Sequence, residues 1–141
     1  QTLRQIVTEN VWFTDQFKIF SEAANKLPFN HHSVMGLIAP RGLLVIENTS
    51  MEWLGNPSTY TTSVVAHEIW KALGVSNNMG VSQIGGHNHC QLPASQQPEV
   101  TAFVQKFLLN GTTTDTQIQK TDGTFPIEIS RWVNWTTPVL H

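Results

Sequence analysis

Two histidines and the only cysteine of the chain fall within one six-residue segment, Gly85-Gly86-His87-Asn88-His89-Cys90. Imidazole is the side chain most often used as a general base near neutral pH. Adjacent glycines allow backbone angles closed to other residues, and loops on a rigid scaffold are where catalytic side chains concentrate. Either His87 or His89 is therefore a candidate base, and their positions alone do not separate them.

A histidine base of this kind suits a serine nucleophile, because a serine hydroxyl attacks poorly until an imidazole accepts its proton. A carboxylate must hold that imidazole in one tautomer. Glu47 and Glu52 are the candidate acids, since both follow the apolar run 42–46. The sequence contains no Gly-x-Ser-x-Gly motif and so shows no nucleophile elbow. We expect a base whose serine lies in sequence outside this chain.

Both histidines and the cysteine of this segment are also potential metal ligands. A site would need further ligands, and the sequence has no second cluster of Cys, His and carboxylate side chains. His67 and Glu68 begin like a zinc-protease helix, but Lys71 stands where the second histidine is required. We therefore expect no metal and no other cofactor, and we expect a structural role for His67.

The elements that would position this segment follow an α/β pattern. Residues 42–46 and 79–84 are predicted to be strands, the first of them buried on both faces. Apolar periodicity predicts helices over 14–27, 31–38, 59–73 and 98–110, with short extended pieces at 125–129 and 132–135. Strands alternating with helices indicate a parallel sheet. Since two strands do not make a stable sheet, we expect residues 1–141 to be the C-terminal portion of a single larger catalytic domain.

Composition excludes several functional classes. Charged residues make up 13% of the chain and the net charge is −2, which gives no electrostatic reason to expect nucleic acid or an anionic membrane as a partner. No apolar run approaches the roughly 20 residues of a membrane span. The chain opens with polar Gln1-Thr2 and not with a signal peptide, so we expect either that such a segment was removed or that the chain begins within a longer protein. We expect a monomeric protein.

The lone cysteine and three sequons bear on the compartment. A single cysteine is either a buried free thiol or a half-cystine whose partner lies outside the chain. Sequons predict glycosylation at Asn48, Asn110 and Asn134. Glycosylation and a disulfide both favour a secreted, extracellular protein.

Several segments occur in one order along the chain: TENVWF (8–13), HH (31–32), LIAPR (37–41), IEN (46–48), EWLG (52–55), ALGV (72–75), MGVSQIG (79–85), HNHC (87–90) and FVQKFLL (103–109). Together they resemble the C-terminal third of the fungal glucuronoyl esterases, carbohydrate esterase family 15. The resemblance implies a secreted serine esterase of the α/β-hydrolase fold, a three-layer sandwich, without a metal. Such enzymes cleave the ester between 4-O-methyl-D-glucuronic acid of glucuronoxylan and lignin alcohols.

The resemblance also implies roles for single residues. His89 matches the catalytic histidine of the family, which directly precedes a cysteine. Cys90 matches that cysteine, which is disulfide-bonded to the one before the nucleophilic serine. Trp53, Glu9 and Gln1 match residues that bind the substrate sugar.

The chain departs from the family pattern at several points. The motif Gly-Cys-Ser-Arg-x-Gly-Lys is absent, and the usual fungal catalytic glutamate lies upstream of Gln1. No cysteine occurs at 59–62, where fungal relatives often carry another disulfide. Glu52 stays a second candidate acid, by similarity to some bacterial relatives. Two alternatives remain open: an inactive fragment or carbohydrate-binding remnant, and an acetyl or feruloyl xylan esterase of the same fold.

Overall fold

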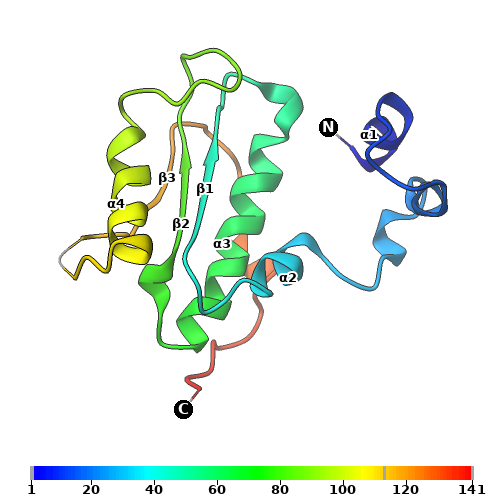
Figure 1. The fold of residues 1–141 in the computed structure, drawn as a ribbon. Coiled ribbons are helices and arrows are strands. Elements are labelled where there is room, and N and C mark those ends of the chain that lie inside the picture. Colours follow the sequence, from blue (N-terminus) through cyan, green and yellow to red (C-terminus); the bar gives the residue numbers. More distant parts are fainter. Residues whose placement is uncertain (1, 113, 141) are drawn as a thin grey trace.

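A parallel three-stranded sheet lies at the centre of the computed structural model, which describes residues 2–112 and 114–140 (Figure 1). Its strands, in the order β1-β2-β3, are β1 (Leu43–Glu47), β2 (Met79–Gln83) and β3 (Gln119–Thr121). The register pairs Glu47 with Gln83 and Gln83 with Thr121. The carboxyl ends of all three strands therefore meet at one edge of the sheet, where ligands bind in open α/β folds.

Helices and single 3-10 turns make up the rest of the described secondary structure. The α-helices are α1 (Leu3–Glu9), α2 (His31–Gly36), α3 (Asn56–Ala72) and α4 (Gln97–Leu108). The 3-10 turns are η1 (Asp15–Phe20), η2 (Ala24–Lys26), η3 (Glu52–Leu54), η4 (Ser76–Asn78) and η5 (Ile129–Arg131). The predictions of β1, β2, α2, α3 and α4 are confirmed, with boundaries that differ by at most three residues. Strand β1 is half-buried except at Glu47, so the expectation that it is buried on both faces is wrong for the described chain. Within the described ranges, no helix is long and apolar enough to cross a membrane.

Successive side chains of a strand point to opposite faces of the sheet. In β2 both of these faces are covered by helices. Met79 of β2 packs against Trp70 of α3. Its neighbour Gly80 faces α4, where an added Cβ would lie 3.2 Å from the Phe103 ring. All five residues of β2 are buried. Helix α3, the sheet and helix α4 thus form three layers (Figure 1).

Trp70 anchors the core between α3 and the sheet. Its side chain is fully buried, and its indole Nε1 donates a hydrogen bond to the Arg41 carbonyl at 2.9 Å. Helix α3 ends at Ala72, and Gly74, two residues later, has a φ of +71°. The Gly74 amide donates to the Lys71 carbonyl and the Val75 amide to the Trp70 carbonyl, both at 2.9 Å. This pair of bonds is a Schellman cap, in which glycine takes the left-handed position without a Cβ clash.

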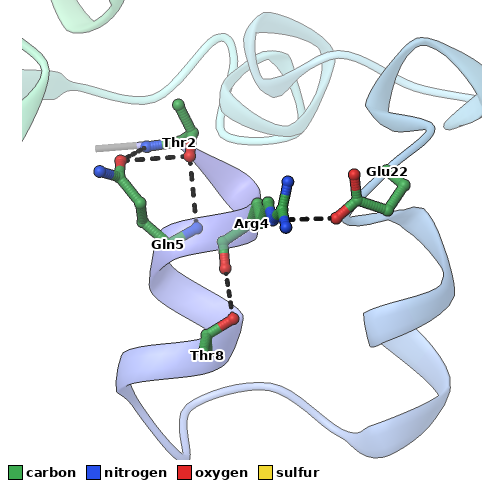
Figure 2. Close-up of polar contacts among 5 residues, drawn as sticks. All are labelled: Thr2, Arg4, Gln5, Thr8 and Glu22. Carbon is green, nitrogen blue, oxygen red and sulfur yellow. Dashed lines mark hydrogen bonds and ion pairs between the residues drawn. The ribbon is translucent and has the colours of Figure 1, made fainter.

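The N-terminal arm, residues 2–30, begins with a helix that the sequence patterns did not predict. Helix α1 starts with a capping box, in which Thr2 Oγ1 accepts from the Gln5 amide at 3.3 Å and Gln5 Oε1 accepts from the Thr2 amide at 2.7 Å (Figure 2). Arg4 forms an exposed ion pair with Glu22 at 3.1 Å, which joins α1 to the residues after η1. In Figure 1 the arm lies beyond α3 from the sheet.

The predicted helix over 14–27 is wrong, because the structure has two separate 3-10 turns there. The Phe13 and Phe17 rings stack with centroids 5.0 Å apart, and the Phe20 ring packs against Phe17 at 5.9 Å with a tilt of 53°. No residue of η1 is buried. An amphipathic stripe stabilises a helix mainly when a tertiary surface covers it, and the described residues supply no such surface.

The C-terminal segment also differs from its prediction. Neither 125–129 nor 132–135 is a strand, and the missed strand β3 lies earlier in the chain. Strand β3 is short and polar, and pairing with β2 brings it into the sheet. The Val81 amide donates to the Ile118 carbonyl at 2.8 Å, and the Asp122 amide donates to the Gln83 carbonyl at 3.2 Å.

Candidate active site

A pocket of about 410 Å³ opens at the carboxyl edge of the sheet. Its lining comes from β1, η3, α3 and residues 85–90, which we name the histidine loop. The lining includes Glu47, His87, His89 and Cys90. A larger pocket of about 500 Å³ lies between α2, α3 and the C-terminal segment, and it contains none of the predicted site residues. The chemistry expected from the sequence therefore gathers in the smaller pocket.

His87 is held by the protein through both ring nitrogens. Its Nε2 lies 2.9 Å from the Ile84 carbonyl oxygen, and its Nδ1 lies 3.0 Å from that of Asn88 and 3.2 Å from Asn48 Nδ2. These contacts bind the imidazole to its own loop and to the end of β1. The geometry therefore favours an anchoring role for His87.

His89 has a different environment. Its ring is exposed and packs edge-on against Trp53 of η3, with centroids 4.7 Å apart and an interplanar angle of 67°. Trp53 is itself 49% exposed. An accessible imidazole beside an accessible aromatic face combines a proton acceptor with a surface on which a sugar ring can stack. The structure thus brings together two of the residues that the resemblance selected.

The two candidate acids are placed differently. Glu47 is buried at the end of β1, and its Oε2 accepts a hydrogen bond from Gln83 Nε2. Gln83 Nε2 also donates to the Asn56 carbonyl at 2.9 Å. Glu52 is exposed at the start of η3. In the described residues neither carboxylate is hydrogen-bonded to His89, so the structure selects neither as its partner.

Asn48 holds the centre of the histidine loop. Its Nδ2 donates to the His87 carbonyl at 2.8 Å, and its Oδ1 accepts from the Ser50 amide at 2.9 Å. Only 5% of Asn48 is exposed. The prediction that Asn48 carries a glycan is therefore wrong for this fold, since the amide nitrogen is buried and in use. Asn110 and Asn134 are exposed, and their glycosylation stays a prediction.

Asp122, directly after β3, is a loop contact that the sequence patterns did not reveal. Burial acts to raise the pKa of Asp122, but hydrogen bonds from the Gly85 amide and the Thr49 hydroxyl outweigh it and hold the pKa below its ordinary value. The carboxylate therefore stays charged beside the loop.

Cys90 is exposed, with a free thiol among the described residues and a left-handed φ of 62°. The alternative of a buried free thiol is therefore wrong. The disulfide to a cysteine outside the chain stays a prediction. Within the part of the chain that the structure describes, no group of three or more His, Cys, Asp or Glu side chains could hold a metal.

Of the other two predicted sugar contacts, Glu9 is not brought to this pocket. Glu9 is exposed at the end of α1, on the N-terminal arm beyond α3 (Figure 1). Gln1 lies outside the described residues. His67, expected to be structural, is half-buried on α3, and its Nε2 lies 2.9 Å from the Ser76 carbonyl oxygen.

Comparison with known proteins decides the family. Residues 1–74 match the family model described as "Glucuronyl esterase, fungi". The chain belongs to this family. The 4-O-methyl-glucuronoyl methylesterases of Hypocrea jecorina and Podospora anserina are 49% and 46% identical to it over 140 and 143 residues. These matches cover 99% and 100% of this chain and 30% of each relative. The chain thus spans about 30% of the length of these two curated relatives.

Solved structures of glucuronoyl esterases share the fold. The catalytic domain from Hypocrea jecorina is 48% identical and superposes with a TM-score of 0.90, covering 100% of this chain and 38% of that one. A mutant of the Sporotrichum thermophile enzyme, in complex with methyl 4-O-methyl-beta-D-glucopyranuronate, is 39% identical with a TM-score of 0.91 and the same coverage. The predicted α/β-hydrolase fold and the resemblance to fungal glucuronoyl esterases are therefore confirmed.

Proposed function

We propose that this protein is a serine esterase that hydrolyses the ester between 4-O-methyl-D-glucuronic acid of glucuronoxylan and lignin alcohols. The observation that carries the proposal is the contact between the exposed Trp53 ring and His89, which lines the pocket at the carboxyl edge of the sheet. Supporting it, the relatives are named 4-O-methyl-glucuronoyl methylesterases, and one solved relative holds a methyl glucuronate ester. Residues 1–141 would be the C-terminal portion of a single catalytic domain.

His89 is the general base of the proposed mechanism. It removes the proton of a serine from outside this chain, and the serine oxygen attacks the ester carbonyl of the uronate. The alcohol leaves with the proton from His89, and an acyl-enzyme remains. Water, activated by His89, then releases the uronic acid and restores the serine. The catalytic acid is an upstream glutamate, with Glu52 as the second candidate.

Trp53 orients the sugar in this proposal. Its exposed face beside His89 suits stacking against a pyranose ring, which would hold the ester near the base. Glu9 and Gln1 are proposed, by resemblance, to bind uronate hydroxyls. The Glu9 contact would come from the N-terminal arm rather than from the pocket lining.

The protein is proposed to act outside the cell as a monomer, without nucleic acid or a membrane as partner. Cys90 is exposed next to the base, which suits a disulfide to a cysteine before the nucleophilic serine. Asn110 and Asn134 are exposed, as glycosylation requires.

The substrate class is tested with the full-length protein on three esters in parallel: methyl 4-O-methyl-glucuronate, an acetyl ester and a feruloyl ester. We expect kcat/KM for the glucuronate ester to exceed the other two by at least about a hundredfold, because only the uronate uses the sugar contacts. Preference for the acetyl or feruloyl ester would replace the proposed substrate. Binding of glucuronate without hydrolysis of any ester would indicate a carbohydrate-binding remnant.

A further inference from the structure

We propose that Asp122 is a positioning residue for His89, and that it acts by tying the histidine loop to the ends of β1 and β3. The proposal rests on the proposed function, in which His89 is the base. Asp122 directly follows β3, the strand that lies beside β2 in Figure 1. It touches neither the base nor the substrate, and its effect passes through the backbone of the loop.

Asp122 joins the carboxyl ends of all three strands. Its Oδ2 accepts from the Gly85 amide at 2.8 Å, at the start of the loop after β2. Its Oδ1 accepts from the Thr49 hydroxyl at 2.5 Å, in the segment after β1. Its own amide donates to the Gln83 carbonyl at 3.2 Å. A charged acceptor makes hydrogen bonds roughly twice as strong as a neutral one.

The start of the loop depends on such outside contacts, because it consists of two glycines. Gly86 has a φ of +80°, and its amide donates to Ser50 Oγ at 2.7 Å. At Gly85 an added Cβ would lie 2.6 Å from Thr49 Oγ1 and 2.8 Å from Ser50 Oγ. Neither residue has a side chain that could pack to fix its own backbone. The direction in which the loop leaves β2 is therefore set by the hydrogen bonds that the two glycine amides donate to Asp122 and Ser50.

The loop has a second anchor at its centre, where Asn48 and Ile84 hold His87. That anchor holds His87, two residues before His89, against the segments that follow β1 and β2. Within the described residues, its hydrogen bonds do not reach β3. Asp122 supplies the tie to β3. Since it is exposed, its replacement removes little buried surface, so we expect catalysis to suffer more than folding.

The test measures kcat and KM of the full-length protein on methyl 4-O-methyl-glucuronate. We expect Asp122→Ala to lower kcat by about ten- to a hundredfold with KM within about twofold, because small misplacements of a catalytic group cost rate rather than binding. The kcat of Asp122→Asn should lie between those of wild type and Asp122→Ala. Its single amide oxygen can replace only one of the two carboxylate oxygens that accept from Gly85 and Thr49. Asp115→Ala is the matched control, an exposed aspartate before β3, and it should stay within about twofold of wild type.

Thr49 provides a second and milder probe of the same tie. Thr49→Val removes the hydroxyl at constant shape and should lower kcat, whereas Thr49→Ser keeps the hydroxyl and should restore it. Titration to completion with a serine-directed phosphonate counts folded active sites in every variant. This pair keeps the test decisive if Asp122→Ala folds poorly.

Two outcomes would overturn the positioning role. One is a wild-type kcat per titrated site in Asp122→Ala, or in Thr49→Val if the former does not fold. The other is a rise in KM that accounts for the whole loss in kcat/KM. Failure of the proposed function looks different: the wild type would not hydrolyse the ester, or His89→Ala would retain its rate.

Discussion

At the scale of single residues, two histidines that are equivalent by sequence position differ in their surroundings. Both ring nitrogens of His87 contact carbonyl and amide groups of the protein. His89 presents an exposed ring beside Trp53. A general base must be able to reach the proton it removes. Accessibility therefore separates the two candidates and favours His89. The resemblance favours the same residue, because the catalytic histidine of the family directly precedes a cysteine.

Replacement of the two histidines tests this assignment. In the full-length protein, His89→Ala should lower kcat by about 10⁴-fold or more, because the serine loses its proton acceptor. His87→Ala should lower kcat far less while lowering the temperature of unfolding, since it removes an anchor of the loop. Steady-state kinetics and thermal melts give both numbers. Near-normal activity of His89→Ala beside an inactive, well-folded His87→Ala would reverse the roles.

At the scale of elements, the site is the meeting point of three strand ends. Asn48 follows β1, the histidine loop follows β2 and Asp122 follows β3. Three contacts that hold the loop, from Asn48, Asp122 and Ser50, each cross from one strand end to another. Parallel strands bring their carboxyl ends together whatever their separation in sequence. These contacts therefore fix the backbone of the loop although it begins with two glycines.

The turn from α3 into η4 carries a pH-dependent contact. Burial of His67 disfavours its imidazolium and lowers the pKa, although the Ser76 carbonyl acts in the opposite direction. The unfolded chain then binds the proton more readily than the folded chain. The stability that neutral His67 contributes is therefore fully present above about pH 6.5 and is lost as the pH falls toward the folded-state pKa.

Urea unfolding at pH 5, 6, 7 and 8 measures this effect. We expect the free energy of unfolding of the wild type to decrease from pH 7 to pH 5, and His67→Gln to show a shallower decrease. His31→Gln is the matched control, because His31 is exposed on α2. Equal pH slopes for wild type and His67→Gln would show that His67 does not contribute.

At the scale of the whole molecule, the chain spans about 30% of the length of its curated relatives. It nevertheless superposes on the corresponding part of solved glucuronoyl esterases with TM-scores of 0.90 and 0.91. The proposed base His89, its neighbour Trp53 and the residues that anchor the histidine loop all belong to this part. A serine and its oxyanion donors would come from elsewhere in the proposed enzyme. Function is therefore a property of the full-length protein, in which the proposals above are tested.

Glycan occupancy is expected to follow burial across the molecule. In protein secreted from a fungal host, Asn110 and Asn134 should carry glycans and Asn48 should not. Enzymatic deglycosylation converts an occupied asparagine to aspartate, which peptide mass spectrometry detects. Asn110→Gln should leave kcat unchanged, whereas Asn48→Gln should lower it, because Asn48 holds the histidine loop and Asn110 lies after the end of α4, away from it. A glycan on Asn48 would contradict the buried placement of its amide.

The local features of this protein can be predicted from its sequence alone. Continuous or periodic apolar runs predict β1, β2, α3 and α4, and the Gly-Gly-His-Asn-His-Cys segment marks the loop that holds the proposed base, because these signals are carried by neighbouring residues. The remaining features depend on contacts between residues that are distant in sequence. The tertiary structure added β3, whose polar residues become a strand by pairing with β2. It replaced the helix over 14–27 with 3-10 turns, since its aromatic stripe lacks a covering surface. It also brought Asp122 to Gly85 across 37 positions of sequence, a contact that depends on strand order and that no local pattern records.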